Sequence, residues 1–210
     1  PDSPRPLPAD GVRCRIVYTG AVYHVNYAAF RCLIASFAEL ADLRPELHIY
    51  TAQDPTQLAA EGIAGPNVCV FPHVDPGQAW ERQQEATVLF LGFAFDKAIA
   101  AIVQSSAPGK LGDYLASGVP IVALAPRESF LIEYLSTQNC GAVVDQLDPQ
   151  LLAAAIRALV TDVNHRETLV TNALGCARRE FAASAAVQQL VRALGPRGEA
   201  AEHNNKGSGA

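Results

Sequence analysis

The feature that most constrains this sequence is a series of short apolar runs, rich in β-branched and aromatic residues, that alternate with helical patterns. The runs are CRIVYTG (14–20), ELHIYTA (46–52), NVCVFPH (67–73), TVLFLGF (87–93), PIVALA (120–125) and GAVVD (141–145). Runs that are apolar at most consecutive positions are typical of strands buried on both sides of a parallel sheet. The sequence therefore predicts an α/β fold with a Rossmann-like, doubly wound parallel sheet.

Amphipathic spacing between the strands predicts the helices. We expect helices over residues 26–40, 78–86, 109–117, 129–136, 149–161, 166–181 and 184–194, a helical turn near Gln57, and an irregular stretch after the fourth strand. Asn26 is the expected N-cap of the first helix. The proline-rich residues 1–10 are predicted to form a linker, residues 11–194 the folded domain, and residues 195–210 a disordered tail.

Composition narrows the class of protein. With 50% apolar residues, the 210-residue chain can bury one sizeable core. Its 16 Lys and Arg against 21 Asp and Glu, without a basic run interleaved with aromatics, argue against a nucleic-acid partner. The five cysteines form no C-x-x-C pair, and we interpret them as reduced core residues of a cytosolic protein.

The ends of the sequence and its longest apolar run bear on targeting. No apolar run reaches the ~18 to 20 residues needed to span a bilayer. The chain contains no methionine and begins PDSPRPLP, which resembles neither a signal peptide nor a natural start. We interpret it as a fragment that another segment precedes.

Ligands of parallel sheets bind at the carboxyl ends of the strands, where helix N-termini attract phosphate. The most informative loop there opens the segment SSAPGKLGDYLASGVPIVAL. Pro108 suits the first turn of a helix, which predicts exposed amides at Gly109, Lys110 and Leu111. Lys110 adds a positive charge, and Asp113 can accept hydrogen bonds from a sugar diol.

The run PGKLGDYLASGVPI (108–121) resembles the P-x-K-L-x-E-Y-L-A-x-G-x-P-I segment of glycosyltransferase family 4 and its GT-B relatives. The order of elements over residues 13–162 is similar as well. This resemblance implies the C-terminal, nucleotide-sugar-binding half of a two-domain glycosyltransferase. It places Asp113 at the second acid of a Glu-x7-Glu motif, which binds the ribose hydroxyls. The first acid, near the donor sugar, is replaced by Ser105, so Asp96 is the alternative contact.

The YTGAVYHVN loop after the first strand carries further candidates. Gly20 resembles the family's glycine beside the donor pyrophosphate, where a glycine lets the backbone approach closely. Members of the family commonly add an Arg and a Lys soon afterwards, whereas this chain offers only Arg31, deep in the predicted helix. Lys110 and helix N-termini are expected to take over that charge. His24 is a candidate for phosphate or leaving-group stabilisation, with a solvated loop histidine as the alternative.

Two more loops end at the same edge of the predicted sheet. In FPHVDPGQ, the resemblance places the backbone of His73 and Val74 at the nucleobase. A lone histidine gives no metal site, and we expect neither a metal nor another cofactor. In APRESFLIEYL, Arg127 or Glu128 could touch the sugar, and Ser129 is the expected cap of the next helix.

These residues predict binding of a nucleotide diphosphate sugar, with uridine as the base favoured by resemblance. Glycosyl transfer needs stabilisation of the departing diphosphate, which amides and a cation supply without a metal. The resemblance implies retention of configuration and an acceptor (a sugar, lipid or other small molecule) held by a missing N-terminal Rossmann-like domain. We expect a cytoplasmic location, with the membrane surface reached through that domain as an alternative, and no transfer by the fragment alone. Half of a nucleotide-sugar 2-epimerase and a non-catalytic nucleotide-binding module remain alternatives, the latter supported by Ser105.

Overall fold

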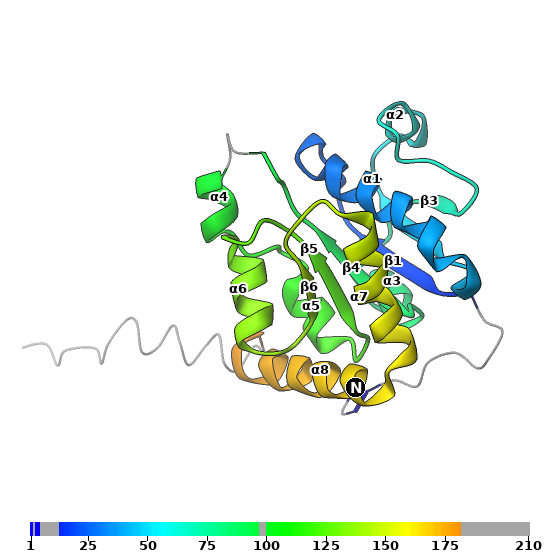
Figure 1. Ribbon diagram of the computed structural model, residues 1–210. Coiled ribbons are helices and arrows are strands. Elements are labelled where there is room, and N and C mark those ends of the chain that lie inside the picture. Colours follow the sequence, from blue (N-terminus) through cyan, green and yellow to red (C-terminus); the bar gives the residue numbers. More distant parts are fainter. Residues whose placement is uncertain (2, 5–12, 97–99, 182–210) are drawn as a thin grey trace, which may run out of the picture.

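The computed structural model describes residues 1, 3–4, 13–96 and 100–181 (Figure 1). Their strands form one parallel sheet in the order β3-β2-β1-β4-β5-β6. The strands are β1 (Arg15–Thr19), β2 (Glu46–Thr51), β3 (Val68–Pro72), β4 (Val88–Gly92), β5 (Ile121–Leu124) and β6 (Ala142–Val144). The predicted Rossmann-like, doubly wound fold is confirmed, and the strand order reverses between β1 and β4.

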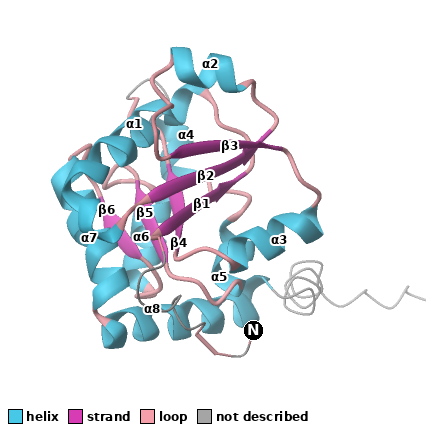
Figure 2. Ribbon diagram, turned by 90° about the vertical axis from the view of Figure 1, so that its right-hand side faces the viewer, coloured by secondary structure: helices cyan, strands magenta, loops and turns pink. Residues whose placement is uncertain are grey.

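Helices cover both faces of this sheet (Figure 2). One face carries α1 (Tyr27–Ser36), its 3-10 extension η2 (Phe37–Leu43) and α7 (Pro149–Thr161). The other face carries α3 (Pro76–Gln84), α5 (Leu111–Ala116), α6 (Phe130–Thr137) and α8 (Val163–Cys176). The shorter elements are η1 (His24–Asn26), α2 (Pro55–Ala60), α4 (Ala100–Ser105) and the π-helical turn η4 (Ala177–Phe181).

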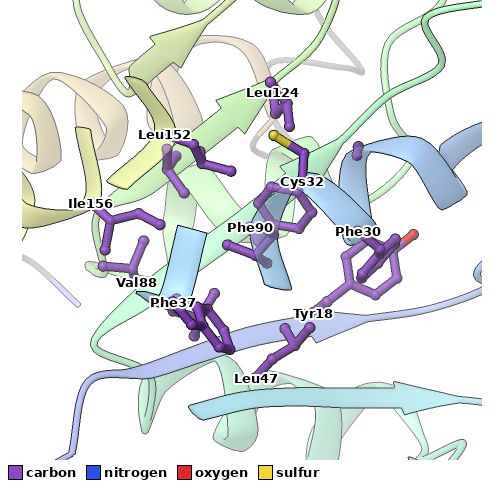
Figure 3. Close-up of a cluster of buried hydrophobic side chains, with 14 of the residues drawn as sticks. Tyr18, Phe30, Cys32, Phe37, Leu47, Val88, Phe90, Leu124, Leu152 and Ile156 are labelled. Carbon is purple, nitrogen blue, oxygen red and sulfur yellow. The ribbon is translucent and has the colours of Figure 1, made fainter. Parts of the chain in front are cut away.

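The core beneath α1 and α7 is built around aromatic rings (Figure 3). Phe30 of α1 lies edge-on to Tyr18 and to Phe90, with ring centroids 4.9 and 5.5 Å away. Aliphatic side chains from the strands and from α7 close around the rings, among them Leu47, Val88, Leu124, Leu152 and Ile156. Edge-to-face pairs of this kind stabilise the fold by more than the burial of their apolar area alone.

Aspartate followed by proline begins three of the helices. Asp54, Asp75 and Asp148 each accept a hydrogen bond from a backbone N–H in the first turn, at 2.7, 2.9 and 2.8 Å. Proline is well tolerated at the next position, because a backbone N–H in the first turn of a helix has no helical partner to lose. Ser129 caps α6 as predicted, since its hydroxyl accepts the N–H of Ile132 at 3.2 Å.

The structure differs from the predicted elements in several places. The helices predicted over 78–86 and 109–117 correspond to α3 (Pro76–Gln84) and α5 (Leu111–Ala116). The stretch after β4, predicted to be irregular, contains α4, because its alanines favour a helix without producing an amphipathic pattern. The helix predicted over 26–40 is divided into η1, α1 and η2. Asn26 precedes α1, but its side-chain oxygen accepts the N–H of Tyr23 at 2.9 Å instead of capping α1, because η1 already turns the chain there.

Several predictions fall on parts of the chain without a description. Of the predicted linker, only residues 1, 3 and 4 are described, and the predicted helix 184–194 and tail 195–210 lie outside the described residues. The helix predicted over 166–181 corresponds to α8 and η4.

All five cysteines are free thiols, and four of them are buried. No helix within the described ranges is long and apolar enough to cross a membrane.

The packing of Phe90 gives a first prediction. Phe90→Ala should lower the free energy of unfolding by about 3–5 kcal/mol, because it leaves a cavity between β4 and α1 that the surrounding side chains cannot fill. Urea denaturation measures this change. Leu151→Ala on α7 is the control: its side chain is 46% exposed, and the loss should stay below about 1 kcal/mol. Equal losses in the two variants would contradict the central place of Phe90.

Candidate functional site

A pocket lies at the carboxyl ends of β1 and β4, where the strand order reverses. Its volume is about 330 Å³, and its walls come from three loops: the one after β1, the one after β4, and the one that leads into α5. We call it the switch-point pocket, and Tyr18, Gly20, Tyr23, Phe93, Gly109 and Lys110 are among its lining residues. Open parallel sheets bind ligands at this position.

Lys110 and Gly20 meet in this pocket. The ammonium nitrogen of Lys110 lies 3.7 Å from the centroid of the Tyr18 ring, over its face. Gly20 has a φ of +118°, and a Cβ there would lie 3.2 Å from the Lys110 nitrogen. A glycine is therefore needed both for the backbone conformation and for the space that the lysine occupies.

The charge of Lys110 is poorly compensated. Burial lowers the pKa of the Lys110 amine from 10.5 to about 7, with no contribution from a carboxylate. Among the ion pairs of residues 13–96 and 100–181, none includes Lys110. The amine instead has a cation–π contact with the Tyr18 ring. An anion that entered the pocket would stabilise the protonated amine and raise its pKa.

Asp113 faces a different hollow. Its exposed side chain lines a groove of about 460 Å³ on the outer face of α5, together with Trp80 of α3 and Phe181 of η4. We call this the α5 groove. It meets the switch-point pocket at Gly109, which lines both. Lys110 and Asp113 are thus close in sequence but open into adjoining hollows.

A third hollow of about 590 Å³ extends from the other side of the switch-point pocket, beyond β5 and β6. We call it the polar cavity. It brings together the three predicted sugar contacts Asp96, Arg127 and Glu128. Arg127 donates a hydrogen bond to Asp145 at 2.6 Å, which lowers the pKa of that carboxyl. Ala94 and Val103 line both the polar cavity and the switch-point pocket.

The remaining predicted residues lie outside these three hollows. His24 at the start of η1, His73 after β3 and Ser105 at the end of α4 are exposed, and Val74 packs against the core. The predicted exposed amide of Leu111 is wrong. Its N–H donates to the carbonyl of Pro108 at 2.9 Å, because a turn closes immediately before α5, and its side chain is fully buried.

Sequence reasoning missed a buried polar network behind the switch-point pocket. The N–H of Thr19 donates to the hydroxyl of Tyr114 at 3.0 Å, and the Gln83 amide donates to the hydroxyl of Thr19 at 2.9 Å. These bonds join β1, α5 and α3; Gly20 directly follows β1, Lys110 directly precedes α5, and Trp80 lies in α3. The tyrosine of the DYLASG run was the available signal, but an apolar ring on a buried helix face explains it equally well. The rim residue Tyr23, 58% exposed, was also missed.

Metal ligands do not gather in the part of the chain that the structure describes. No group of three or more His, Cys, Asp or Glu side chains there is arranged to hold an ion.

The all-parallel sheet and a pocket at the reversal of its strand order define a Rossmann-like domain with a ligand crevice. Residues 13–162 match the model of the family described as glycosyl transferases group 1. The chain therefore belongs to that family. A search of curated proteins gave no significant match.

Solved structures share the fold. Anabaena HepE in complex with UDP-glucose superposes with a TM-score of 0.66 and 13% identity, over 87% of this chain and 48% of HepE. The C-terminal domain of the Francisella tularensis glycosyl transferase LpcC gives 0.57 and 10%, over 80% and 85%. A candidate UDP-N-acetylglucosamine 2-epimerase from Listeria monocytogenes gives 0.55 and 12%, over 86% and 47%.

These similarities identify the fold as that of the C-terminal domain of GT-B glycosyltransferases. At such identities they show the fold alone. The chain spans about half the length of HepE, 48%.

The buried network generates a second prediction. Tyr114→Phe should lower the free energy of unfolding by about 1–3 kcal/mol, because the N–H of Thr19 loses its buried acceptor. Chemical denaturation of the purified protein measures the change. Tyr134→Phe is the matched control, since its hydroxyl bonds to the partly exposed carboxylate of Glu180, which water can solvate. If Tyr114→Phe were as stable as the wild type, the network would have no structural role.

Proposed function

We propose that this domain binds a nucleoside diphosphate sugar, with UDP as the nucleotide, for transfer to an acceptor held by a second Rossmann-like domain. The observation that carries the proposal is the half-buried amine of Lys110, which lies beside Gly20 in the switch-point pocket without a carboxylate partner. A buried cation without an acid is costly to maintain. An anionic ligand offsets that cost.

The diphosphate is proposed to lie between Gly20 and Lys110. Gly20 leaves the backbone after β1 without a side chain, so phosphate oxygens can approach it closely. Lys110 supplies the charge that relatives take from basic residues after the first strand. Arg31 is unsuited to this role, because its guanidinium donates to the carbonyl of Glu61 at 2.9 Å.

The nucleoside is proposed to extend from Gly109 into the α5 groove. The exposed carboxylate of Asp113 can accept hydrogen bonds from both ribose hydroxyls. The base would continue toward the loop after β3, where the backbone of His73 and Val74 offers polar groups. Trp80 lines the same groove as Asp113.

The donor sugar is proposed to enter the polar cavity. Asp96, Arg127 and Glu128 provide carboxylate acceptors and a guanidinium donor for its hydroxyls. These residues compensate for Ser105, which stands where the resemblance expects an acid. In this proposal the three adjoining hollows would take base and ribose, diphosphate, and sugar in the order in which a nucleotide sugar joins them.

The proposed chemistry is the departure of the diphosphate from the sugar. Negative charge grows on the phosphate oxygen as that bond breaks, and protonated Lys110 lies where it would stabilise this charge. The proposal requires no metal, and it includes retention of configuration as the outcome that the family resemblance implies. An acceptor sugar, lipid or other small molecule would reach the donor from the second domain.

Binding of UDP tests the diphosphate and ribose sites. We expect Lys110→Met to weaken binding by about 1.5–3 kcal/mol, because it removes a charged contact to the phosphates. Asp113→Ala should weaken UDP binding by about 1–3 kcal/mol and affect 2′-deoxy-UDP less, because one ribose hydroxyl is already absent. Isothermal titration calorimetry measures each affinity.

Arg31→Met is the matched control for the loss of a cation, because Arg31 lies on α1 outside the three hollows and should leave the affinity unchanged. UDP affinity that is insensitive to Lys110→Met but reduced by Arg31→Met would reject the proposed position of the diphosphate.

Transfer requires both reactants in one water-poor cleft, since alignment can lower the barrier by roughly 7–11 kcal/mol. We expect no sugar transfer by the 210-residue chain alone. The same sequence joined to a second, acceptor-binding domain should transfer sugar in the presence of a chelator. Product formation from radiolabelled nucleotide sugars measures both. Conversion of UDP-N-acetylglucosamine to its 2-epimer by the two-domain protein would favour an epimerase, and nucleotide binding without turnover would favour a non-catalytic module.

A further inference from the structure

Lys110 combines three properties that bear on its reactivity. Its amine opens into a pocket of about 330 Å³, so small molecules can reach it. The Tyr18 ring and the backbone at Gly20 hold the amine in place. Its surroundings are mostly apolar, with Leu91, Phe93 and Val103 among the walls.

We propose that Lys110, whose amine lines the apolar switch-point pocket, is an acylation site that reacts with a short-chain acyl thioester. The nitrogen lone pair attacks the thioester carbonyl carbon, and a carbon–nitrogen bond forms as the carbon–sulfur bond breaks. The sulfur leaves as a thiolate, which takes up the proton that the nitrogen loses. The products are an amide and a thiol, and no oxidant or reductant takes part.

The surroundings of Lys110 favour this reaction. Desolvation makes a lysine nucleophilic at neutral pH, because it destabilises the protonated form. Burial lowers the pKa of Lys110 to about 7, so about half of the amine is unprotonated at that pH. The titratable side chains that line the same pocket are the phenols Tyr18 and Tyr23, while Asp113 and Asp96 line the adjoining hollows.

The pocket also selects the reagent. A thioester carbonyl and a short acyl chain are uncharged, so they enter an apolar pocket without the desolvation cost of an ion. The amide product carries no positive charge, and its acyl group fills space beside Gly20. That space is narrow, because even a Cβ added at Gly20 would lie 3.2 Å from the Lys110 nitrogen. Only this consequence, the loss of diphosphate binding, rests on the proposed function. The acylation itself does not.

The sequence supplies internal references for the test, because its other lysines are Lys97 and Lys206. The full 210-residue protein is incubated with S-acetyl-N-acetylcysteamine, a small acyl thioester, and acetylation at each lysine is followed by peptide mass spectrometry. At pH 7.5 an ordinary lysine with a pKa of about 10.4 is almost entirely protonated. We expect Lys110 to react at least about tenfold faster than the other two.

The pH dependence of the acetylation rate distinguishes a lysine with a lowered pKa from one that reacts only because it is exposed. The rate at Lys110 should be half-maximal near its pKa of about 7 and level off above it, because the neutral amine is then fully formed. Rates at Lys97 and Lys206 should continue to rise toward pH 10. Equal rates at the three lysines, or a rate at Lys110 that rises without levelling off, would overturn the proposal.

Added UDP distinguishes this inference from the proposed function. Slower acetylation of Lys110 in saturating UDP, with unchanged rates at the other two lysines, supports both. Selective acetylation that UDP does not slow supports the acylation site and rejects the diphosphate position. Undetectable acetylation of Lys110 in a protein that binds UDP through Lys110 overturns the acylation site alone.

Discussion

Burial of a fully parallel sheet on both faces is the constraint on which the rest of the structure depends. Because all strands run in one direction, the loops after β1, β3, β4 and β5 emerge at a single edge. The reversal of strand order between β1 and β4 sends the neighbouring helices to opposite faces and leaves a crevice between them. The position of the switch-point pocket follows from this topology, whereas its chemistry depends on the side chains that enter it.

Lys110 shows how that chemistry opposes stability. A cation beside an aromatic ring and apolar walls loses hydration that no carboxylate restores. The polar network of Thr19, Gln83 and Tyr114 lies directly behind it and fixes β1, α3 and α5 to one another. The network thereby fixes β1, which carries Tyr18, relative to α5, which Lys110 directly precedes. An anionic ligand, by supplying a counter-charge, would offset part of the cost of burying the amine.

The structure shows which residues lie where the chain departs from the family pattern, at Ser105 and at Arg31. Ser105 cannot supply the expected acid, but the polar cavity collects Asp96 and Glu128 close to the same edge. Arg31 is held by the carbonyl of Glu61, so the charge near Gly20 comes from Lys110 on a distant segment. The proposed donor site is thus assembled from different elements than a comparison of single positions would suggest.

The sequence by itself determined the strands, most helices, the Ser129 cap and the motif around Lys110, because apolar periodicity and capping depend on residues close together in the chain. Only the tertiary structure decided that Lys110 packs against Gly20 while Asp113 opens into the α5 groove, and that the amide of Leu111 is already bonded. The direction of a side chain and the pKa of a buried amine depend on which segments far apart in sequence pack around them. The residues next to a side chain in the sequence do not determine that packing. The sequence could therefore predict which loops form the site, but not how their side chains are arranged.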